Sequence, residues 1–310
     1  MRSQAFTVTA LADELDDARV ETLTQALTAH GATIERTTWR SPRAPRVLAI
    51  DVTLAAADDP DRGRAHSLRA ALLAAAPVDV AVVPAAVAAP GPRLLVADMD
   101  STLIQVECID ELARRHGVYD DVAAVTAAAM RGELDFEASL RARVARLAGL
   151  DAAVLDDLAA HLPITDGAST LVRAIHHDGG HAAVVSGGFT FATRVLAARL
   201  GLDHAHANVL EIDGGRLTGR LIGPAVTPAR KAELVDELAA RHGLPAARVV
   251  AVGDGANDLL MLERAGLGVA FHAKPRVAAA ADTALTGGGL ERILYLLGWD
   301  HAAIDGLAAA

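Results

Sequence analysis

The stretch that decides the fold is VADMDSTL, residues 96–103, which follows the apolar pair Leu94 and Leu95. An apolar run of this kind is typical of a buried strand, and it ends at Asp98. At the carboxyl end of a parallel strand the chain enters the crevice where open α/β sheets bind ligands. Asp98 and Asp100 together are equally compatible with a solvated turn. In a crevice, however, one carboxylate can attack a phosphorus atom while the other moves protons.

Three other segments place polar groups at predicted strand ends or helix starts. VVSGG, residues 184–188, offers the Ser186 hydroxyl and the Gly187 amide to a phosphate. Lys231 opens a predicted helix, and AVGDGAND, residues 251–258, ends another strand with two carboxylates and an amide. Each segment alone has an ordinary explanation as a turn or a solvated helix start. All four in this order, three of them at strand ends, favour a catalytic site.

Size and composition limit the classes of function. A chain of 310 residues suffices for one large or two modest domains with an ample core. Apolar residues make up 52% and aromatic residues only 3%, which argues against an aromatic platform for nucleic acid. The net charge of −10 provides no general basic surface for DNA, RNA or an anionic membrane. We therefore expect a small-molecule substrate and neither a nucleic-acid nor a membrane partner.

The compartment is predicted from what the sequence lacks. Cys108 is the only cysteine, so no intramolecular disulfide is possible and nothing points to an oxidising compartment. Residues 1–15 contain no apolar core of a signal peptide. The most apolar stretch, residues 70–96, is interrupted by an aspartate and four prolines, so it is not expected to cross a membrane. We expect a cytoplasmic protein.

The pattern of elements predicts two regions that separate at residues 84–92, a Pro- and Ala-rich linker. Residues 1–84 read as βαββαβ, which predicts a small ferredoxin-like domain. The expected strands are 5–10, 33–39, 46–54 and 78–83, and the expected helices are 15–30 and 62–76.

The second region, residues 93–300, predicts an α/β fold with a doubly wound parallel sheet. Its helical insertion at about 105–165 has no convincing strand, so it reads as a cap placed just after the first catalytic strand. Residues 300–310 are expected to be frayed. The expected strands are 93–97, 182–185, 249–252 and 267–270.

These motifs carry a family resemblance. DMDSTLI, SGG, the lysine and GDGANDLLML resemble the four motifs of the haloacid dehalogenase-like phosphatase superfamily. From about residue 93 to about 298, ECIDELARRHG, AAAMRGELDFEASLRARVARLAGL, VVSGGF and AVGDGANDLLMLERAGLGVAF are similar to the phosphoserine phosphatase family. The resemblance implies hydrolysis of O-phospho-L-serine to L-serine and phosphate through an aspartyl-phosphate, the last step of serine biosynthesis.

The resemblance also implies roles for the catalytic groups. Asp98 is the expected nucleophile, and Asp100 is expected to protonate the departing serine oxygen and then to take a proton from water. Ser186, the Gly187 amide and Lys231 are expected to bind the phosphoryl oxygens, with help from Asn257.

The resemblance further implies Mg²⁺, held by Asp98, the Asp100 carbonyl and Asp254. Oxygen ligands suit magnesium, and no set of Cys and His residues suggests zinc. Thr102 is expected to support the motif loop, and Asp258 to orient Lys231.

For the amino-acid part of the substrate, the resemblance assigns the ammonium to Glu107 and the carboxylate to Arg143. Met130 and Phe136 are expected to close over the substrate and exclude water. From composition alone, an arginine on such a helix is more often solvated, and Met and Phe are more often core residues. The joint match to the family pattern outweighs those priors.

The N-terminal region resembles an ACT-type regulatory domain, a type that commonly pairs across subunits and binds a small amino acid. The first loop, residues 11–17, lacks the glycine that ligand-binding members typically carry there. We therefore favour a dimerisation or structural role in a homodimer, and an amino-acid effector stays open.

Two alternatives to the leading hypothesis remain. The same chemistry could act on phosphohomoserine or phosphothreonine, or pass the phosphoryl group to an alcohol acceptor. Phosphoethanolamine is disfavoured because it has no carboxylate to match Arg143. A non-catalytic amino-acid sensor on a dead phosphatase fold would be expected to lack Asp98, Asp100, Lys231 or Asp254, and all four are present.

Overall fold

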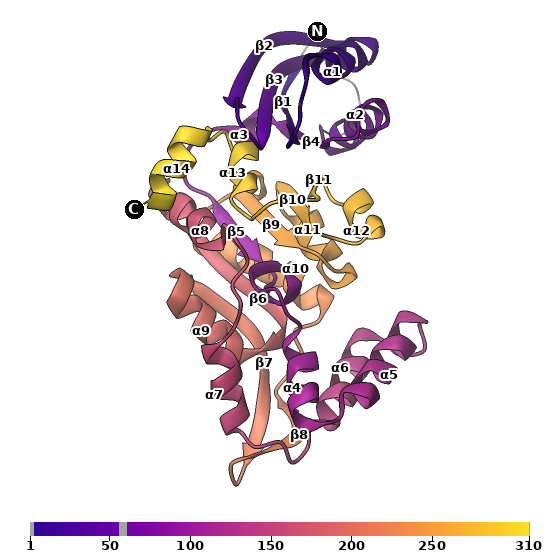
Figure 1. The fold of residues 1–310 in the computed structure, drawn as a ribbon, viewed down its shortest axis with the longest axis vertical. Helices are drawn as coiled ribbons and strands as arrows, with labels where there is room; N and C mark the ends of the chain where they lie inside the picture. The colour runs from indigo at the N-terminus through magenta and orange to yellow at the C-terminus, as the bar shows by residue number, and fades with distance from the viewer. Residues whose placement is uncertain (1–2, 56–60, 310) are drawn as a thin grey trace.

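The computed structural model describes residues 3–55 and 61–309. They form two sheets, one of four strands in the order β2-β3-β1-β4 and one of seven in the order β11-β10-β9-β5-β6-β7-β8. The smaller sheet and its helices lie at one end of the molecule, and the helices α4 to α7 lie toward the other (Figure 1).

The N-terminal region has the predicted ferredoxin-like order. β1 is antiparallel to both of its neighbours, β3 and β4, and β2 is antiparallel to β3. Of the predicted region, residues 1–2 and 56–60 lie outside the described part of the chain. The elements are β1 (Ser3–Ala12), α1 (Asp17–Ala29), β2 (Ala32–Ser41), β3 (Arg46–Ala55), α2 (Asp61–Ala75) and β4 (Asp79–Pro84).

Alternation along the strands explains why both helices cover the same face of this sheet. Phe6 and Val8 of β1 point toward the helices and are buried together with Leu23 of α1 and Leu72 of α2. Asp16 caps α1, since its carboxylate accepts a hydrogen bond of 2.8 Å from the backbone N–H of Arg19.

The larger sheet is doubly wound as predicted, with β5 (Leu94–Ala97) between β6 (His181–Phe189) and β9 (Val249–Gly253). Leu95 and Ala97 belong to the core on one face of the sheet, and Leu94 and Val96 to the core on the other. The first face is covered by α8 (Ala168–His177), α9 (Thr190–Leu200) and α13 (Arg292–Leu296). The second is covered by α10 (Pro228–Arg241), α11 (Leu259–Arg264) and α12 (Pro275–Ala280).

All four predicted strands of this sheet are present, and β10 (Leu267–Phe271) is the fourth of them. Three more escaped prediction: β7 (His204–Asp213), β8 (Arg216–Ile222) and β11 (Thr283–Leu285). β11 has only three residues, and β7 and β8 form a partly exposed antiparallel pair whose polar side chains hide the strand pattern.

The insertion after β5 is helical, as predicted. It contains α4 (Cys108–His116), α5 (Tyr119–Met130), α6 (Phe136–Ala145) and α7 (Ala153–Ala160). Its two ends meet at an antiparallel bridge between Ile104 and Ile164, so the cap leaves and rejoins the sheet at one place. Short helical turns cover Met99–Leu103 (η1), Ala246–Arg248 (η2) and Ala256–Asp258 (η3).

The predicted linker at 84–92 connects the two sheets and is itself ordered: it contains the short helix α3 (Ala85–Ala88), and the buried Arg93 guanidinium donates to three of its carbonyls. The prediction of a frayed C-terminus is wrong, because residues His301–Ala309 form α14, whose Ile304 is 3% exposed. An apolar side chain at the centre of α14 holds it against α8. No helix of the described residues is long and apolar enough to span a membrane.

Candidate active site

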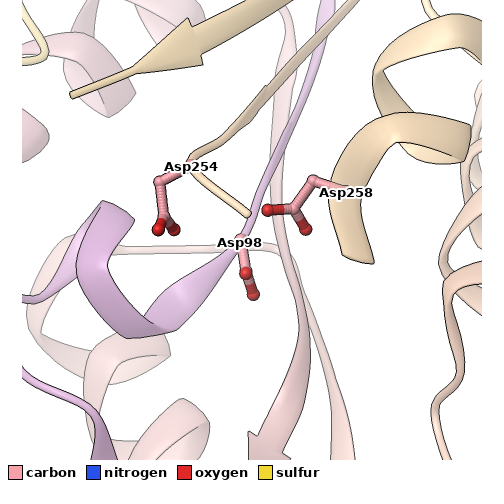
Figure 2. Close-up of side chains that lie close together, drawn as sticks. All are labelled: Asp98, Asp254 and Asp258. Carbon is pink, nitrogen blue, oxygen red and sulfur yellow. The ribbon is translucent and has the colours of Figure 1, made fainter. Parts of the chain in front are cut away.

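The carboxyl ends of three adjacent strands bring the predicted motifs together. Ala97 of β5 lies beside Val184 of β6 and Val252 of β9, so the residues that follow each strand meet at one edge of the sheet. The backbone N–H of Asp98 donates to the Val252 carbonyl at 2.9 Å, which continues the sheet pairing into the site. Figure 2 shows the carboxylates of Asp98 and Asp254 grouped with that of Asp258.

Asp98 is held by a backbone and a side-chain contact. Its Oδ1 accepts a hydrogen bond of 2.7 Å from the Met99 N–H at the start of η1, and it lies 2.8 Å from Lys231 Nζ. Asp98 is 4% exposed and lines the cavity described below. The carboxylate therefore has a fixed direction while remaining open to a small ligand.

Lys231 sits in the first turn of α10, which Thr227 caps by accepting from the Arg230 N–H at 3.2 Å. Its Nζ is fully buried between Asp98 and Asp258, whose Oδ1 lies at 2.7 Å. Burial alone would lower the pKa of Lys231, but the two carboxylates outweigh it and raise that pKa above its ordinary value. The ammonium is therefore a fixed positive charge beside Asp98.

Asp100 follows in η1, and its Oδ1 accepts from the Cys108 N–H at 3.2 Å. Burial, together with the charges of Glu107 and Asp98, raises the pKa of Asp100 well above its ordinary value. A carboxyl group that keeps its proton more readily is suited to donate it to a leaving group.

Asp254 completes the acidic group. Thr102 donates to its Oδ1 at 3.1 Å, and burial with the charges of Asp98 and Glu107 raises its pKa to about 6. One oxygen each of Asp98, Asp254 and Asp258 lies within 4.8 Å of the others. Asp258 already binds Lys231 Nζ through one oxygen and the Gly255 N–H through the other.

This arrangement fits a divalent cation. Carboxylates crowded in a buried site raise one another's pKa, and a hard cation with oxygen ligands relieves that repulsion. Lys231 contacts both Asp98 and Asp258. Asp258 also uses its second oxygen for the Gly255 N–H, whereas Asp98 Oδ2 has only a 3.4 Å contact with Asn257. Asp98 and Asp254 are therefore the carboxylates better able to coordinate the cation.

The Ser186-Gly187-Gly188 segment, expected just beyond a strand ending at residue 185, continues β6 through an irregularity after Val185. Ser186 is 1% exposed, and its Oγ accepts from the Gly188 N–H at 2.8 Å. Asn208 of β7 holds this segment, since its Nδ2 donates to the Gly187 carbonyl at 2.8 Å. Sequence reasoning missed Asn208 because β7 itself was not recognised.

The site opens into a cavity of about 150 Å³ between the strand ends and the cap. Ile109 and Gly188 line it without having been predicted; Ile109 follows Glu107 by two residues at the start of α4, and Gly188 belongs to the recognised SGG motif. The other lining residues were all predicted to be site residues: Asp98, Asp100, Glu107, Phe136, Arg143, Ser186, Gly187, Asp254 and Asn257.

The cap side of the cavity carries one acidic side chain, Glu107, and one basic side chain, Arg143. Glu107 accepts a hydrogen bond of 2.8 Å from the Ser101 hydroxyl, and it lines the cavity. Loss of solvent around its carboxylate raises the pKa of Glu107. Burial lowers the pKa of Arg143, against the opposing charge of Glu107. The Arg143 Nε donates to the Ser139 carbonyl at 3.4 Å, and among the described residues its two terminal nitrogens make no further hydrogen bond, so they can bind a ligand.

Phe136 lies against the phosphate-binding segment, since a Cβ added at Gly187 would come within 2.9 Å of its Cζ. Met130 is placed differently from the expectation. It ends α5 just before a turn at Gly132, is 73% exposed and does not line the cavity. In this arrangement Phe136 lines the cavity beside Gly187, and Met130 faces solvent.

With the geometry established, comparison with known proteins identifies the family. The model for haloacid dehalogenase-like hydrolases matches residues 95–263. The chain belongs to that hydrolase family. A relative named phosphoserine phosphatase, from Streptomyces coelicolor, is 48% identical over 298 residues, which cover 96% of this chain and 72% of that protein. The resemblance inferred from the motifs is thereby confirmed.

Solved structures of this hydrolase family extend the match. The chain is similar to a probable phosphoserine phosphatase from Vibrio cholerae in unliganded form, with a TM-score of 0.72, 36% identity and coverage of 99% of this chain and 88% of that one. It also resembles a phospho-aspartyl intermediate analogue of phosphoserine phosphatase, with a TM-score of 0.62, 40% identity and coverage of 66% and 98%. The chain spans only 56% to 63% of three other relatives.

Proposed function

We propose that this hydrolase converts O-phospho-L-serine to L-serine and inorganic phosphate. One observation carries the proposal: a single cavity of about 150 Å³ holds Asp98 and Asp100 on its sheet side and Glu107 and Arg143 on its cap side. A phosphomonoester that also carries an ammonium and a carboxylate matches that distribution of charge. The small volume favours a substrate of about the size of phosphoserine.

The proposed reaction begins at Asp98. Its carboxylate attacks phosphorus, the P–O bond to serine breaks, and Asp100 donates its proton to the departing oxygen. Water then attacks the aspartyl-phosphate after giving a proton to Asp100, which releases phosphate and restores both side chains. A solved structure described as a phospho-aspartyl intermediate analogue of phosphoserine phosphatase supports the aspartyl-phosphate in this proposal.

Three groups are proposed to hold the phosphoryl oxygens. Ser186, Gly187 and Asn257 all line the cavity, and they offer a hydroxyl, a backbone N–H and a side-chain amide to these oxygens. The Asn257 amide is 3.4 Å from Asp98 Oδ2, so it reaches the reacting centre. Lys231 adds a fixed positive charge at 2.8 Å from the nucleophile and stabilises negative charge that develops on the phosphoryl group.

We propose Mg²⁺ as the cofactor, held by Asp98, Asp254 and the Asp100 carbonyl. When bound, the ion would neutralise phosphoryl oxygens and keep the nucleophile in line. Thr102, through its hydrogen bond to Asp254, and Asp258, through Lys231, keep these groups oriented.

The test is phosphate release in the presence of Mg²⁺, with kcat/KM compared for L-phosphoserine, phosphothreonine, phosphohomoserine and phosphoethanolamine. A preference for L-phosphoserine of about a hundredfold or more is expected from paired recognition of both charged groups. A flat profile, or a preference for phosphohomoserine or phosphothreonine, would overturn the substrate assignment while keeping the Asp98 chemistry. Release of a phosphorylated alcohol in place of phosphate would instead favour phosphotransfer.

The role of the N-terminal region is a separate proposal. We infer a homodimer formed through this region, because β2 is a sheet edge whose described residues include the partly exposed Trp39. Light scattering of the full chain would show a mass near twice that of one chain, and a monomer would contradict the proposal. An amino-acid effector on the ACT-like region and a cytoplasmic location remain predictions.

A further inference from the structure

The N-terminal region packs against β11, the edge strand of the large sheet, and against the end of α11. β4 lies beside β11, and Asp79 accepts hydrogen bonds of 2.9 and 2.8 Å from the N–H and hydroxyl of Thr286. β11 is the edge strand of the sheet and lies two strands away from β9, whose carboxyl end leads to Asp254, so these contacts lie to one side of the active site. A connection between these contacts and the active site must therefore pass through the elements that lie between them.

Arg62 of α2 makes the densest contact across this boundary. Its Nε and Nη2 each lie 2.7 Å from one oxygen of Asp282, a residue that is 8% exposed. The same guanidinium donates to the carbonyls of Leu262 at 3.0 Å and Ala265 at 3.4 Å, and also to that of Glu263.

These carbonyls belong to the C-terminal end of α11 and the residue that follows it. The last carbonyls of a helix have no partner within the helix, and a positive charge there also interacts favourably with the helix dipole. Arg62 therefore caps α11 from outside the catalytic region. Its anchor is fixed within that region, because Asp282 also accepts from the Gly268 N–H at 2.7 Å.

The other end of α11 reaches the catalytic groups. α11 follows directly on Asn257 and Asp258, and Asp258 binds Lys231 Nζ at 2.7 Å. Six helical residues span only about 9 Å. Leu262 in the last turn is 1% exposed, and a Cβ added at Gly268 would come within 2.5 Å of its carbonyl oxygen. A helix this short and this tightly packed moves as one unit.

We propose that Arg62 is a positioning residue for the phosphatase site, acting through α11 on Asp258 and so on the Lys231–Asp98 pair. The N-terminal region then supports catalysis directly, in addition to any role in assembly. The inference rests on the proposed function only in that the site is a phosphatase site, whichever phosphomonoester it prefers.

The test compares Arg62→Gln with Arg64→Gln in the full chain. Arg64 lies on the same helix, and its guanidinium binds the Ala55 carbonyl within the N-terminal region. For Arg62→Gln we expect kcat to fall by about tenfold or more with KM changed little, because a small displacement of catalytic groups is costly. We also expect weaker Mg²⁺ binding by calorimetry, since Asp254 and Asp258 share one loop. Arg64→Gln should match the wild type in all three measurements.

Thermal unfolding distinguishes a role of Arg62 in positioning the catalytic groups from a role that only stabilises the contact between the two regions. An Arg62→Gln protein with a lower Tm but unchanged kcat and unchanged Mg²⁺ affinity would overturn the inference. If Arg62→Gln does not fold, Arg62→Lys serves instead: it keeps the charge beside Asp282 but loses the planar fork, so kcat should still fall. An Arg62→Lys protein with wild-type kcat and Mg²⁺ affinity would likewise overturn it.

Measurement on an aryl phosphate as well as on phosphoserine keeps the two proposals apart. A wild-type enzyme that hydrolyses only the aryl phosphate would refute the phosphoserine assignment, and the effect of Arg62→Gln would then be measured on that substrate. Mg²⁺ affinity, which needs no turnover, would decide the role of Arg62 if neither substrate reacts.

Discussion

Asp98 and Lys231 show at the residue scale how a weak nucleophile is prepared for reaction. The carboxylate receives a backbone N–H from Met99 and lies beside an ammonium that Asp258 holds from the other side. These contacts fix the direction of attack before the substrate arrives, so little reorganisation is needed at the transition state.

The first prediction concerns the nucleophile itself. Asp98→Asn should lower turnover by about a thousandfold or more while the protein stays folded, because the amide keeps the shape but cannot form the aspartyl-phosphate. Phosphate release and circular dichroism would measure the two effects. Asp110→Asn, on α4 and outside the cavity lining, is the control that should remain active. Turnover by the Asp98→Asn protein near the wild-type rate would refute the mechanism.

A second prediction concerns substrate recognition. Arg143→Ala removes a charged hydrogen-bonding partner worth about 1.5–3 kcal/mol, so kcat/KM for phosphoserine should fall by roughly ten- to a hundredfold. An aryl phosphate, which has no carboxylate to bind, should be affected much less. Arg141→Ala is the matched control, since Arg141 lies on the same helix but pairs with Glu137 at the surface. Equal losses on both substrates would show that Arg143 does not bind the carboxylate.

At the scale of elements, the site depends on the contact between the start of α6 and the extension of β6. Phe136 is the first residue of α6, whose N-cap Asp135 accepts from the Ala138 N–H at 2.7 Å and so fixes where the helix begins. The ring then rests on Gly187, where only a glycine leaves room for it. The shape of this part of the cavity therefore depends on α6 and β6 together.

This contact gives a third prediction. Gly187→Ala places a methyl group about 2.9 Å from Phe136 Cζ, so the cap must shift and KM for phosphoserine should rise severalfold. In a Phe136→Ala background the same change should have little further effect on KM, because the clash has gone. Steady-state kinetics of the two single variants and the double variant measure this coupling. Simple additivity would mean that the ring and the glycine act independently.

At the scale of the whole molecule, the acidic edge of the sheet is the part most dependent on a bound ion. Asp98, Asp100, Glu107 and Asp254 line one cavity, and their mutual repulsion opposes folding. A ligand that binds only the folded state stabilises it by mass action, by about 2.7 kcal/mol at a hundred times its dissociation constant.

The fourth prediction follows. Addition of Mg²⁺ to chelator-treated protein should raise the Tm by several degrees, and chelation should abolish phosphate release. Asp254→Asn should lose most of this shift because it removes a proposed ligand. A Tm shift of the same size in Asp254→Asn would place the ion elsewhere.

Local patterns were sufficient for much of this protein. The apolar run before Asp98 and the alternation of strands and helices predicted four of the seven strands of the large sheet and the helical cap, and the family resemblance of the motifs supplied nearly every group that lines the cavity. These are short-range features, because a strand end and its following turn are encoded within a few neighbouring residues.

Only the tertiary structure decided the rest. Asn208, which holds the phosphate-binding segment, lies on a strand that the sequence pattern did not reveal. Met130 was expected to close over the substrate, but its side chain faces solvent. The folded segment at 84–92, the ordered α14 and the contact of Arg62 with α11 depend on partners far away in the sequence. Such contacts carry no local periodicity, so they become visible only when the elements are packed together.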